Sequence, residues 1–224
     1  MTYKKFIEEP MPSYSRGEEI FNYVTHIIGI VIAVVLFIFS IVLGFLERIN
    51  FREFFSLMIL SFGCFSVYAI STAYHGLHSH RISKRIFRII DHCDIYLLVA
   101  GTYTPVCLIG LYPSIWCWII LGIEWSMAIF GIIINALNMN ALWVKILSMI
   151  FYIVGGWIVI FFPPAIKLIP TLAFIFILAG GISYTFGSIL YGIGSKKKWF
   201  HSIFHIFCLI GTILQIIGII TLLY

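Results

Sequence analysis

Hydrophobic residues form long unbroken runs along this chain, and short polar joints separate the runs. A helix needs roughly 20 apolar residues to cross a bilayer core of ~30 Å. Seven runs reach about that length, and they cover approximately residues 21–46, 54–77, 91–111, 115–135, 142–161, 169–192 and 199–223. Because the runs are continuously apolar, they predict helices and not the alternating strands of a membrane barrel. The pattern therefore predicts an all-α, polytopic membrane protein with seven transmembrane helices.

The composition excludes a water-soluble domain. Hydrophobic residues make up 62% of the 224 positions and charged residues only 10%, which no soluble domain of this size could keep from aggregating. We expect a short cytoplasmic tail over residues 1–20, followed by one transmembrane domain over residues 21–224. The charged, proline-bearing segment before the first run does not resemble a cleavable signal peptide. The chain is thus expected to reside in the cell membrane as a multi-pass protein.

Lysine and arginine residues divide unequally between the two sides of the predicted bundle. If the spans alternate in direction, eleven of the 14 fall on one side, whereas Arg48, Arg52 and Lys167 fall on the other. Cytoplasmic loops of membrane proteins carry an excess of these residues. The distribution predicts a cytoplasmic N-terminus and a C-terminus outside. The net charge of +5 is explained by this topology, so we expect no nucleic-acid partner.

Histidines and carboxylates gather at the predicted cytoplasmic surface. His75 lies at the inner end of the second run, and Asp91 and Asp94 lie at the inner start of the third. His201 and His205 lie in the first turns of the seventh run. Their spacing of four residues places both imidazoles on one helix face, one turn apart. The topology therefore brings five chemically active side chains to the same depth of the membrane.

Imidazoles at a common depth predict a metal site. Zinc takes histidine ligands and prefers four ligands in a tetrahedron, so we expect His75, His201 and His205 to bind Zn²⁺. A three-histidine site leaves a position for a water molecule, whose pKa the ion lowers to about 7. Asp91 could then act as a general base, and Ser71 could hydrogen-bond the water or a developing oxyanion. The same histidines would serve a structural zinc if a protein carboxylate filled the fourth position, and the residues alone leave both alternatives open.

Two further polar residues lie inside predicted spans. His26 follows Glu19 and Asn22 at helical spacing on one face of the first span, and we interpret it as a hydrogen-bonded packing residue. Glu124 falls near the middle of the fourth span, where a carboxylate should face the bundle interior, protonated or paired. A proton relay, a substrate contact and a structural hydrogen bond are all compatible with this position.

Four separated motifs resemble the hemolysin III branch of the progestin and adipoQ receptor family. They are the opening segment 18–26, Ser71-x3-His75, the segment 89–105 with its Asp91-His92-Cys93-Asp94 core, and His201-x3-His205. The motifs occur in the order typical of the branch, and the resemblance extends from about residue 18 to the C-terminus. It implies a seven-helix membrane protein with a zinc ion near the cytoplasmic face. His75, His201 and His205 would be its ligands, with Ser71 and Asp91 around a zinc-bound water.

The resemblance also implies two different functions. The wider superfamily includes alkaline ceramidases, which suggests metal-assisted hydrolysis of a membrane lipid amide or ester. The name of the branch suggests instead a protein that permeabilises or remodels membranes, with a zinc that only braces the bundle. A receptor role is a third possibility, although the tail is too short to match the cytoplasmic domain of the animal receptors. Asp94 is an additional carboxylate that competes with Asp91 for the catalytic role.

Overall fold

The computed structural model describes residues 11–78, 82–194 and 197–224, and within them every regular element is a helix. The expected all-α class is therefore confirmed for the described part of the chain. The elements are α2 (Arg16–Phe45), α3 (Phe51–Gly76), α4 (Ile82–Pro105), the π-helix η1 (Val106–Leu111), α5 (Ile115–Asn138), α6 (Leu142–Gly156), the 3-10 helix η2 (Ile158–Phe161), α7 (Pro163–Ile166), α8 (Thr171–Gly194), α9 (Phe200–Ile220) and the 3-10 helix η3 (Thr221–Leu223).

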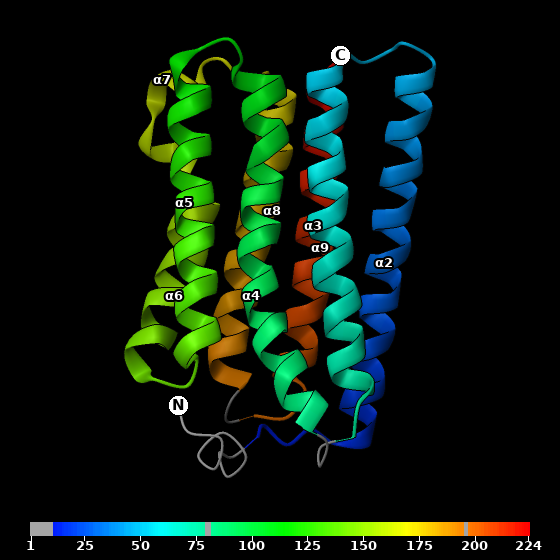
Figure 1. Cartoon of the computed structure of the whole chain (residues 1–224), viewed down its shortest axis with the longest axis vertical. Helices are drawn as coiled ribbons and strands as arrows, with labels where there is room; N and C mark the ends of the chain where they lie inside the picture. Colours follow the sequence, from blue (N-terminus) through cyan, green and yellow to red (C-terminus); the bar gives the residue numbers. More distant parts are fainter. Residues whose placement is uncertain (1–10, 79–81, 195–196) are drawn as a thin grey trace.

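Six of the described helices are long and apolar enough to cross a membrane. They are α2, α3, α4 with its η1 extension, α5, α8 and α9. The expected fifth span, 142–161, is not one continuous helix, because the 15-residue α6 ends at Gly156 and η2 follows it. In Figure 1, α6 lies toward one end of the bundle and α7 at the other.

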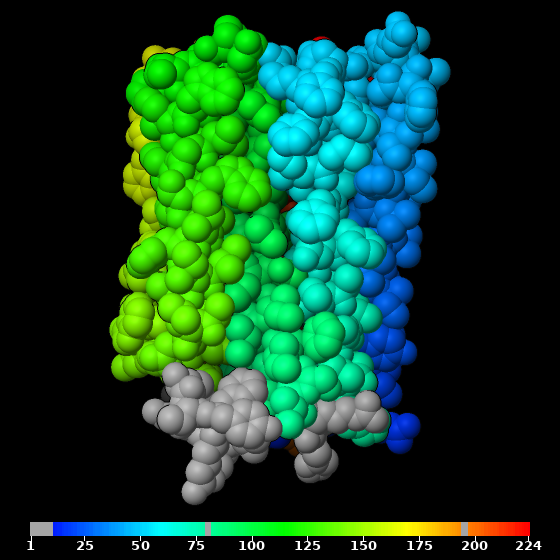
Figure 2. All heavy atoms as spheres, viewed as in Figure 1, coloured from blue at the N-terminus to red at the C-terminus, as the bar shows by residue number. Residues whose placement is uncertain are grey.

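The long helices stand side by side, and α2 begins at the end of the bundle opposite to Tyr224 (Figure 1). Helix α2 packs against α3 and also against α9, so the first and last long helices of the described chain are neighbours. The outer surface is strongly apolar; Figure 2 shows one face of it, over α2, α3 and α5. Large exposed side chains on this exterior include Phe51, Phe55, Phe62 and Phe65 of α3 and Ile129, Phe130 and Ile133 of α5.

Two helices begin earlier than the hydrophobic runs predict, because polar residues form their first turns. Helix α2 begins at Arg16 after a capping box, in which Glu18 N–H donates to Ser15 Oγ and Ser15 N–H donates to Glu18 Oε2. Helix α4 begins at Ile82, nine residues before the expected start at 91. Its first turns carry Lys84 and other basic residues, which suit the headgroup layer at a membrane surface. The polar ends therefore lengthen the helices beyond their apolar cores.

Hydrogen bonds between helices hold the interior together. The Tyr68 hydroxyl on α3 and the Tyr184 hydroxyl on α8 lie 2.5 Å and 2.7 Å from Thr212 Oγ1 on α9. Asn135 Nδ2 on α5 donates to the Tyr96 hydroxyl on α4 at 2.9 Å and to Ser148 Oγ on α6 at 2.8 Å. Polar groups in an apolar bundle must find partners on neighbouring helices. These contacts join α3, α8 and α9 at one place and α4, α5 and α6 at another.

Small residues let aromatic rings approach a helix backbone. A Cβ atom at Gly131 of α5 would collide with the ring of Tyr96 on α4, and one at Gly29 of α2 would collide with Tyr68 on α3. Gly122, on the same helix as Gly131, has open space where its Cβ would lie. Gly131 is thus required by close packing, whereas Gly122 is not.

We expect Gly131→Ala to lower the stability of the protein in detergent by about 1–3 kcal/mol, because the new methyl group forces the Tyr96 ring to move. Gly122→Ala is the matched control, and we expect it to be neutral or to stabilise by up to about 1 kcal/mol through helix propensity. Thermal unfolding followed by circular dichroism measures both variants. Equal unfolding midpoints for the two variants would contradict the assigned packing of α5 on α4.

Candidate metal centre

Four imidazoles meet at the end of the bundle where α2 begins. His26 belongs to α2, His75 to α3, and His201 and His205 to α9. His26, His75 and His205 are buried, and each offers one ring nitrogen within 4.8 Å of the other two. His201 adjoins them, because its Nε2 lies 2.9 Å from Nε2 of His205. The buried triad could hold a metal ion. We call the three histidines of the triad together with His201 the histidine cluster.

Several nitrogens of the histidine cluster lack a partner among the described residues. His75 Nε2 and both ring nitrogens of His26 are buried without a hydrogen bond. A buried polar atom without a partner costs on the order of 1–3 kcal/mol. Neutral imidazole nitrogens are also among the commonest ligands of transition metals. The cluster therefore fits a divalent transition metal better than it fits packing alone.

A carboxylate fixes the orientation of His75. The Nδ1 atom of His75 lies 2.6 Å from Glu19 Oε2 on α2, and the His75 side chain is fully buried. A carboxylate only accepts, so Nδ1–H donates to it, and Nε2 is left to face the histidine cluster. Lys84 Nζ on α4 donates to Glu19 Oε1 at 2.5 Å and to the Leu77 carbonyl at 2.9 Å. Glu19 is thus held from its other side and cannot swing away freely.

The start of α9 is tied to the start of α2. Trp199, the residue before α9, has a left-handed backbone with φ of 66°, and its N–H donates to Glu18 Oε1 at 2.7 Å. The other oxygen of Glu18 accepts from Ser15 in the capping box. Because His201 follows Trp199 by two residues, this bond places the first turn of α9 beside α2. One carboxylate therefore caps one helix and positions the next histidine-bearing helix.

Tyr14 covers the histidine cluster from the end of the bundle. Its ring stacks on His201 with centroids 4.8 Å apart and meets His75 edge-on at 5.7 Å. Burial raises the pKa of the Tyr14 hydroxyl well above its usual range, so the group stays neutral and remains a hydrogen-bond donor. Residues before α2 therefore form part of the site.

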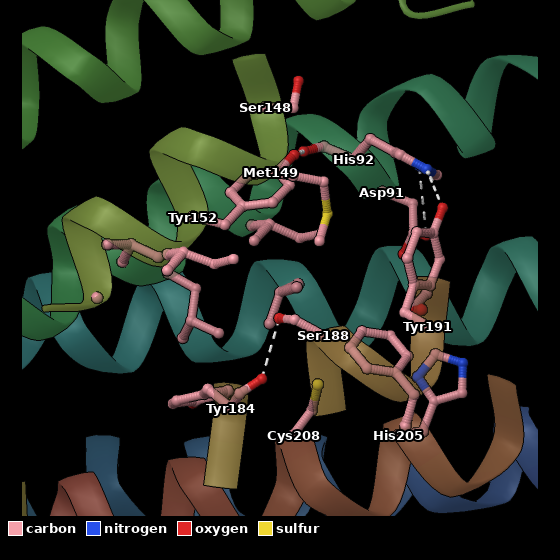
Figure 3. A pocket seen from close by; sticks show the side chains of 18 of the residues that line it. Asp91, His92, Ser148, Met149, Tyr152, Tyr184, Ser188, Tyr191, His205 and Cys208 are labelled. Atoms are coloured by element: carbon pink, nitrogen blue, oxygen red, sulfur yellow. Dashed lines mark hydrogen bonds and ion pairs between the residues drawn. The ribbon is translucent and has the colours of Figure 1, made fainter. Parts of the chain in front are cut away.

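A cavity of about 270 Å³ extends from the histidine cluster between the helices. This is near the lower end of the volumes typical of small-ligand sites. Figure 3 shows its walls: Asp91 and His92 on α4, Met149 and Tyr152 on α6, Tyr184, Ser188 and Tyr191 on α8, and Cys208 and His205 on α9. The lining combines apolar side chains with hydroxyl groups, so it suits an amphiphilic molecule.

The structure brings most of the expected site residues to this cavity. Ser71, Asp91, His201 and His205 line it, and His26 does so too. His75 lies next to them in the histidine cluster but is not one of the lining residues. Asp94 is buried and accepts a hydrogen bond from Ser66 Oγ on α3 at 2.9 Å, away from the lining. Of the two neighbouring carboxylates, it is Asp91 that faces the cavity.

His92 also lines the cavity, but both of its nitrogens are engaged. Its Nδ1 lies 2.9 Å from the Arg88 carbonyl, to which it donates, and its Nε2 lies 3.1 Å from the Tyr191 hydroxyl, from which it accepts. The Tyr152 hydroxyl in turn donates to the His92 carbonyl at 2.8 Å. His92 therefore braces α4 against α6 and α8 and offers no nitrogen to a metal.

The interpretation of His26 as a hydrogen-bonded packing residue is wrong. Neither of its nitrogens has a hydrogen-bond partner in the described part of the chain, and it belongs to the buried triad. The sequence also left Glu19 and Tyr14 without a role. A signal was present for Glu19, because it shares a helical face with Asn22 and His26 at positions i, i+3 and i+7. No pattern in the sequence marked Tyr14.

An apolar groove runs along the outside of α6, next to the cavity. It is lined by Lys145, Ile146, Met149, Ile150, Ile153 and Val154. Lys145, Met149 and Ile153 also line the cavity. The cavity and the outer apolar surface of the bundle therefore share one wall.

Comparisons with known proteins agree with this architecture. Residues 14–216 match the family model described as "Haemolysin-III related". The chain is 33% identical over 195 residues to "Hemolysin-3" of Bacillus cereus, a match that covers 87% of each chain. It is 34% identical over 201 residues to "Hemolysin-3 homolog" of Bacillus subtilis (strain 168), which covers 87% of this chain and 89% of the relative.

We expect Glu19→Gln to weaken metal binding by about 10- to 100-fold, because the amide can no longer fix His75 as a carboxylate does. Isothermal titration of metal-stripped protein with Zn²⁺ or Co²⁺ measures this. Glu53→Gln is the control, since Glu53 belongs to the capping box at the start of α3, whereas His75 lies at the other end of that helix. Unchanged affinity in Glu19→Gln would show that the carboxylate does not orient a ligand.

Proposed function

The chain belongs to the Haemolysin-III related family, and from this premise we propose that it is a zinc-dependent hydrolase of a membrane lipid amide or ester. The protein is a multi-pass protein of the cell membrane. The observation that carries the proposal is the shared cavity: Ser71 and Asp91 line the same space as His26, His201 and His205, three of the four imidazoles of the histidine cluster. A general base, a hydroxyl donor and a metal site around one cavity are the parts of a metal-assisted hydrolase.

His75, His201 and His205 are the proposed zinc ligands. The unpartnered Nε2 of His75 supports the assignment, as does the closeness of the two α9 imidazoles. Zinc suits imidazole ligands, and when bound it polarises a substrate carbonyl and acidifies a water molecule. His26 lies beside them with its centroid 4.2 Å from that of His205, so it is the candidate for replacing His201 in the ligand set.

The other residues of the cavity then handle protons and charge. Asp91 acts as the general base: it accepts a proton from the attacking water and later returns it to the leaving amine or alcohol. Ser71 donates a hydrogen bond to the oxyanion that develops on the carbonyl oxygen. Glu19 keeps His75 in the tautomer that ligates through Nε2. Tyr14 covers the cluster and limits the access of bulk water.

The proposed topology has seven crossings with a cytoplasmic N-terminus. In this arrangement α6, η2 and α7 together make the fifth crossing, although α6 alone is too short. The described basic residues support the orientation: Arg16, Lys84 and Lys145 lie at helix ends on the side of the histidine cluster, and Arg48, Arg52 and Lys167 lie at the opposite ends. The reaction would then occur at the cytoplasmic leaflet.

A lipid substrate would enter sideways through the groove on α6. The groove is apolar and shares Met149 and Ile153 with the cavity wall, so a movement of these two side chains would admit an acyl chain from an apolar environment. Lys145 lies at the start of α6 in the same groove, where an ammonium group attracts anionic headgroups. These features support a membrane lipid, and not a soluble metabolite, as the substrate.

A second candidate is a protein that permeabilises or remodels membranes, with a structural zinc. Both relatives are named as hemolysins, which favours this candidate. The complete burial of the His75 side chain is also compatible with a closed structural site. Leakage of dye from liposomes containing the purified protein, unchanged by removal of the metal, would support this candidate over hydrolysis.

We expect about one zinc per chain in protein purified without chelators, because three imidazoles at a common depth form a high-affinity site. Elemental analysis should find none in a variant with His75, His201 and His205 all replaced by alanine. His26→Ala is the matched control and should keep its zinc. If His26→Ala loses its zinc and His201→Ala keeps it, the third ligand is His26 and not His201.

We expect Asp91→Asn to lower hydrolysis of a panel of fluorescent lipid amides and esters by about 10²- to 10⁴-fold, the usual contribution of a general base. Asp94→Asn is the control, because its carboxylate bonds Ser66 and does not line the cavity. His75→Ala should abolish turnover while the protein remains folded. Equal turnover in wild type, Asp91→Asn and His75→Ala would exclude the proposed reaction.

A further inference from the structure

Glu124 is a second chemically active group, and it lies far from the histidine cluster. It occupies the tenth position of the 24-residue α5, about 14 Å along the helix from Ile115 at 1.5 Å per residue. Its side chain is 98% buried, since only 2% of the residue is exposed. A carboxyl group at this depth of an apolar bundle is costly and is usually functional.

No cation compensates the charge that Glu124 would carry when ionised. None of the ion pairs among the described residues includes Glu124, and its Oε1 has no hydrogen-bond partner there. The titratable groups that face it are Tyr103 on α4 and Cys107 on η1, neither of which can become positively charged. From α6 it is met by Gly155, which has no side chain. The surroundings therefore favour the neutral, protonated acid.

Glu124 lies where α6 stops being an α-helix. A Cβ atom at Gly155 would sit 3.3 Å from Glu124 Oε2, so the carboxyl group occupies the space that a side chain would need. Helix α6 ends one residue later, at Gly156, and Trp157 N–H is shared between the carbonyls of Ile153 and Val154. Interrupted helices inside membrane bundles expose backbone groups that bind protons and ions.

Tyr103 connects Glu124 to the cavity. Tyr103, Gly156 and Trp157 line the deep part of the cavity, and the Tyr103 hydroxyl donates to the Gly156 carbonyl at 3.1 Å. Tyr103 also lies close enough to Glu124 for their charges to interact. Tyr103, which lines the cavity, thus contacts Gly156, the residue next to the Gly155 that Glu124 approaches.

We propose that Glu124 is a proton-binding site, separate from the histidine cluster, which exchanges its proton with the cavity beside the Tyr103 hydroxyl. In the exchange the O–H bond of the carboxylic acid breaks, the proton passes to a water molecule in the cavity, and a carboxylate remains. The Tyr103 hydroxyl can then turn from the Gly156 carbonyl to the carboxylate, which needs a donor. Proton release at Glu124 therefore frees a carbonyl at the end of α6, in the wall of the cavity.

Dicyclohexylcarbodiimide tests the site, because this apolar reagent modifies protonated carboxyl groups in apolar surroundings. Purified protein in detergent is treated between about pH 5 and pH 9 in choline chloride, and peptides are mapped by mass spectrometry. We expect a stable adduct on Glu124 at pH 7 that declines as the pH rises. Glu53, a partly exposed carboxylate paired with Arg52 at the start of α3, is the internal control and should remain unmodified.

Two further measurements make the outcome decisive. Tyr103→Phe should move the midpoint of the pH dependence upward, because the carboxylate loses the hydroxyl donor assigned to it here; an unchanged midpoint would remove Tyr103 from the proposal. Replacing choline by Na⁺ should leave the adduct unchanged at fixed pH. Protection by Na⁺ would identify a sodium site, and absence of the adduct on Glu124 over the whole pH range would overturn the assignment.

Discussion

The gathering of four imidazoles, three of them buried, at one end of an apolar bundle is the constraint on which the rest of this structure depends. Such groups have polar nitrogens on both sides of the ring, and each nitrogen must be satisfied from within the protein. One side of His75 is satisfied by Glu19, which Lys84 holds in turn. The other ring nitrogen of His75, Nε2, has no hydrogen-bond partner among the described residues. His26, His75 and His205 each bring one ring nitrogen to a common space. A metal ion held by the triad could satisfy several of them at once.

The remaining interior serves to keep a cavity beside this centre. Hydrogen bonds at Thr212 join α3, α8 and α9 at one place beside the cavity. Hydrogen bonds at Asn135 join α4, α5 and α6 at another. His92 bonds Tyr191 on α8 and accepts from Tyr152 on α6 through its carbonyl. These contacts fix the separation of the helices without filling the space between them. The apolar exterior supplies no comparable specificity, since lipid chains pack against it as readily as side chains do.

Hydrophobicity alone predicted most of the helices, because a run of about 20 apolar residues has few other structures available in a bilayer. The interruption of α6 was not predictable in this way, since Gly155, Gly156 and Trp157 are as compatible with an apolar run as any helical residues. The common depth of His75, His201 and His205 followed from topology. The role of His26 could not be predicted from the sequence, because a single histidine on a helix face is equally compatible with packing and with metal binding.

The choice between Asp91 and Asp94 illustrates the limit more sharply. Residues three apart lie on nearly the same helix face, so periodicity cannot separate them. The difference arises from Ser66 on α3, which engages Asp94, and from the cavity in front of Asp91. Tyr14 is a similar case, because its stacking on His201 depends on where a non-helical segment lies after folding.

The bond between Trp199 and Glu18 joins residues that are 181 positions apart. During synthesis the first helix leaves the ribosome long before the last, and its capping carboxylate then lacks this partner. The histidines of α9 follow the other two helices of the cluster in the sequence, so the cluster cannot close before α9 is made. A prematurely terminated chain would keep two imidazoles and an acidic helix end without partners in the membrane. The centre therefore assembles only when α9 packs against α2.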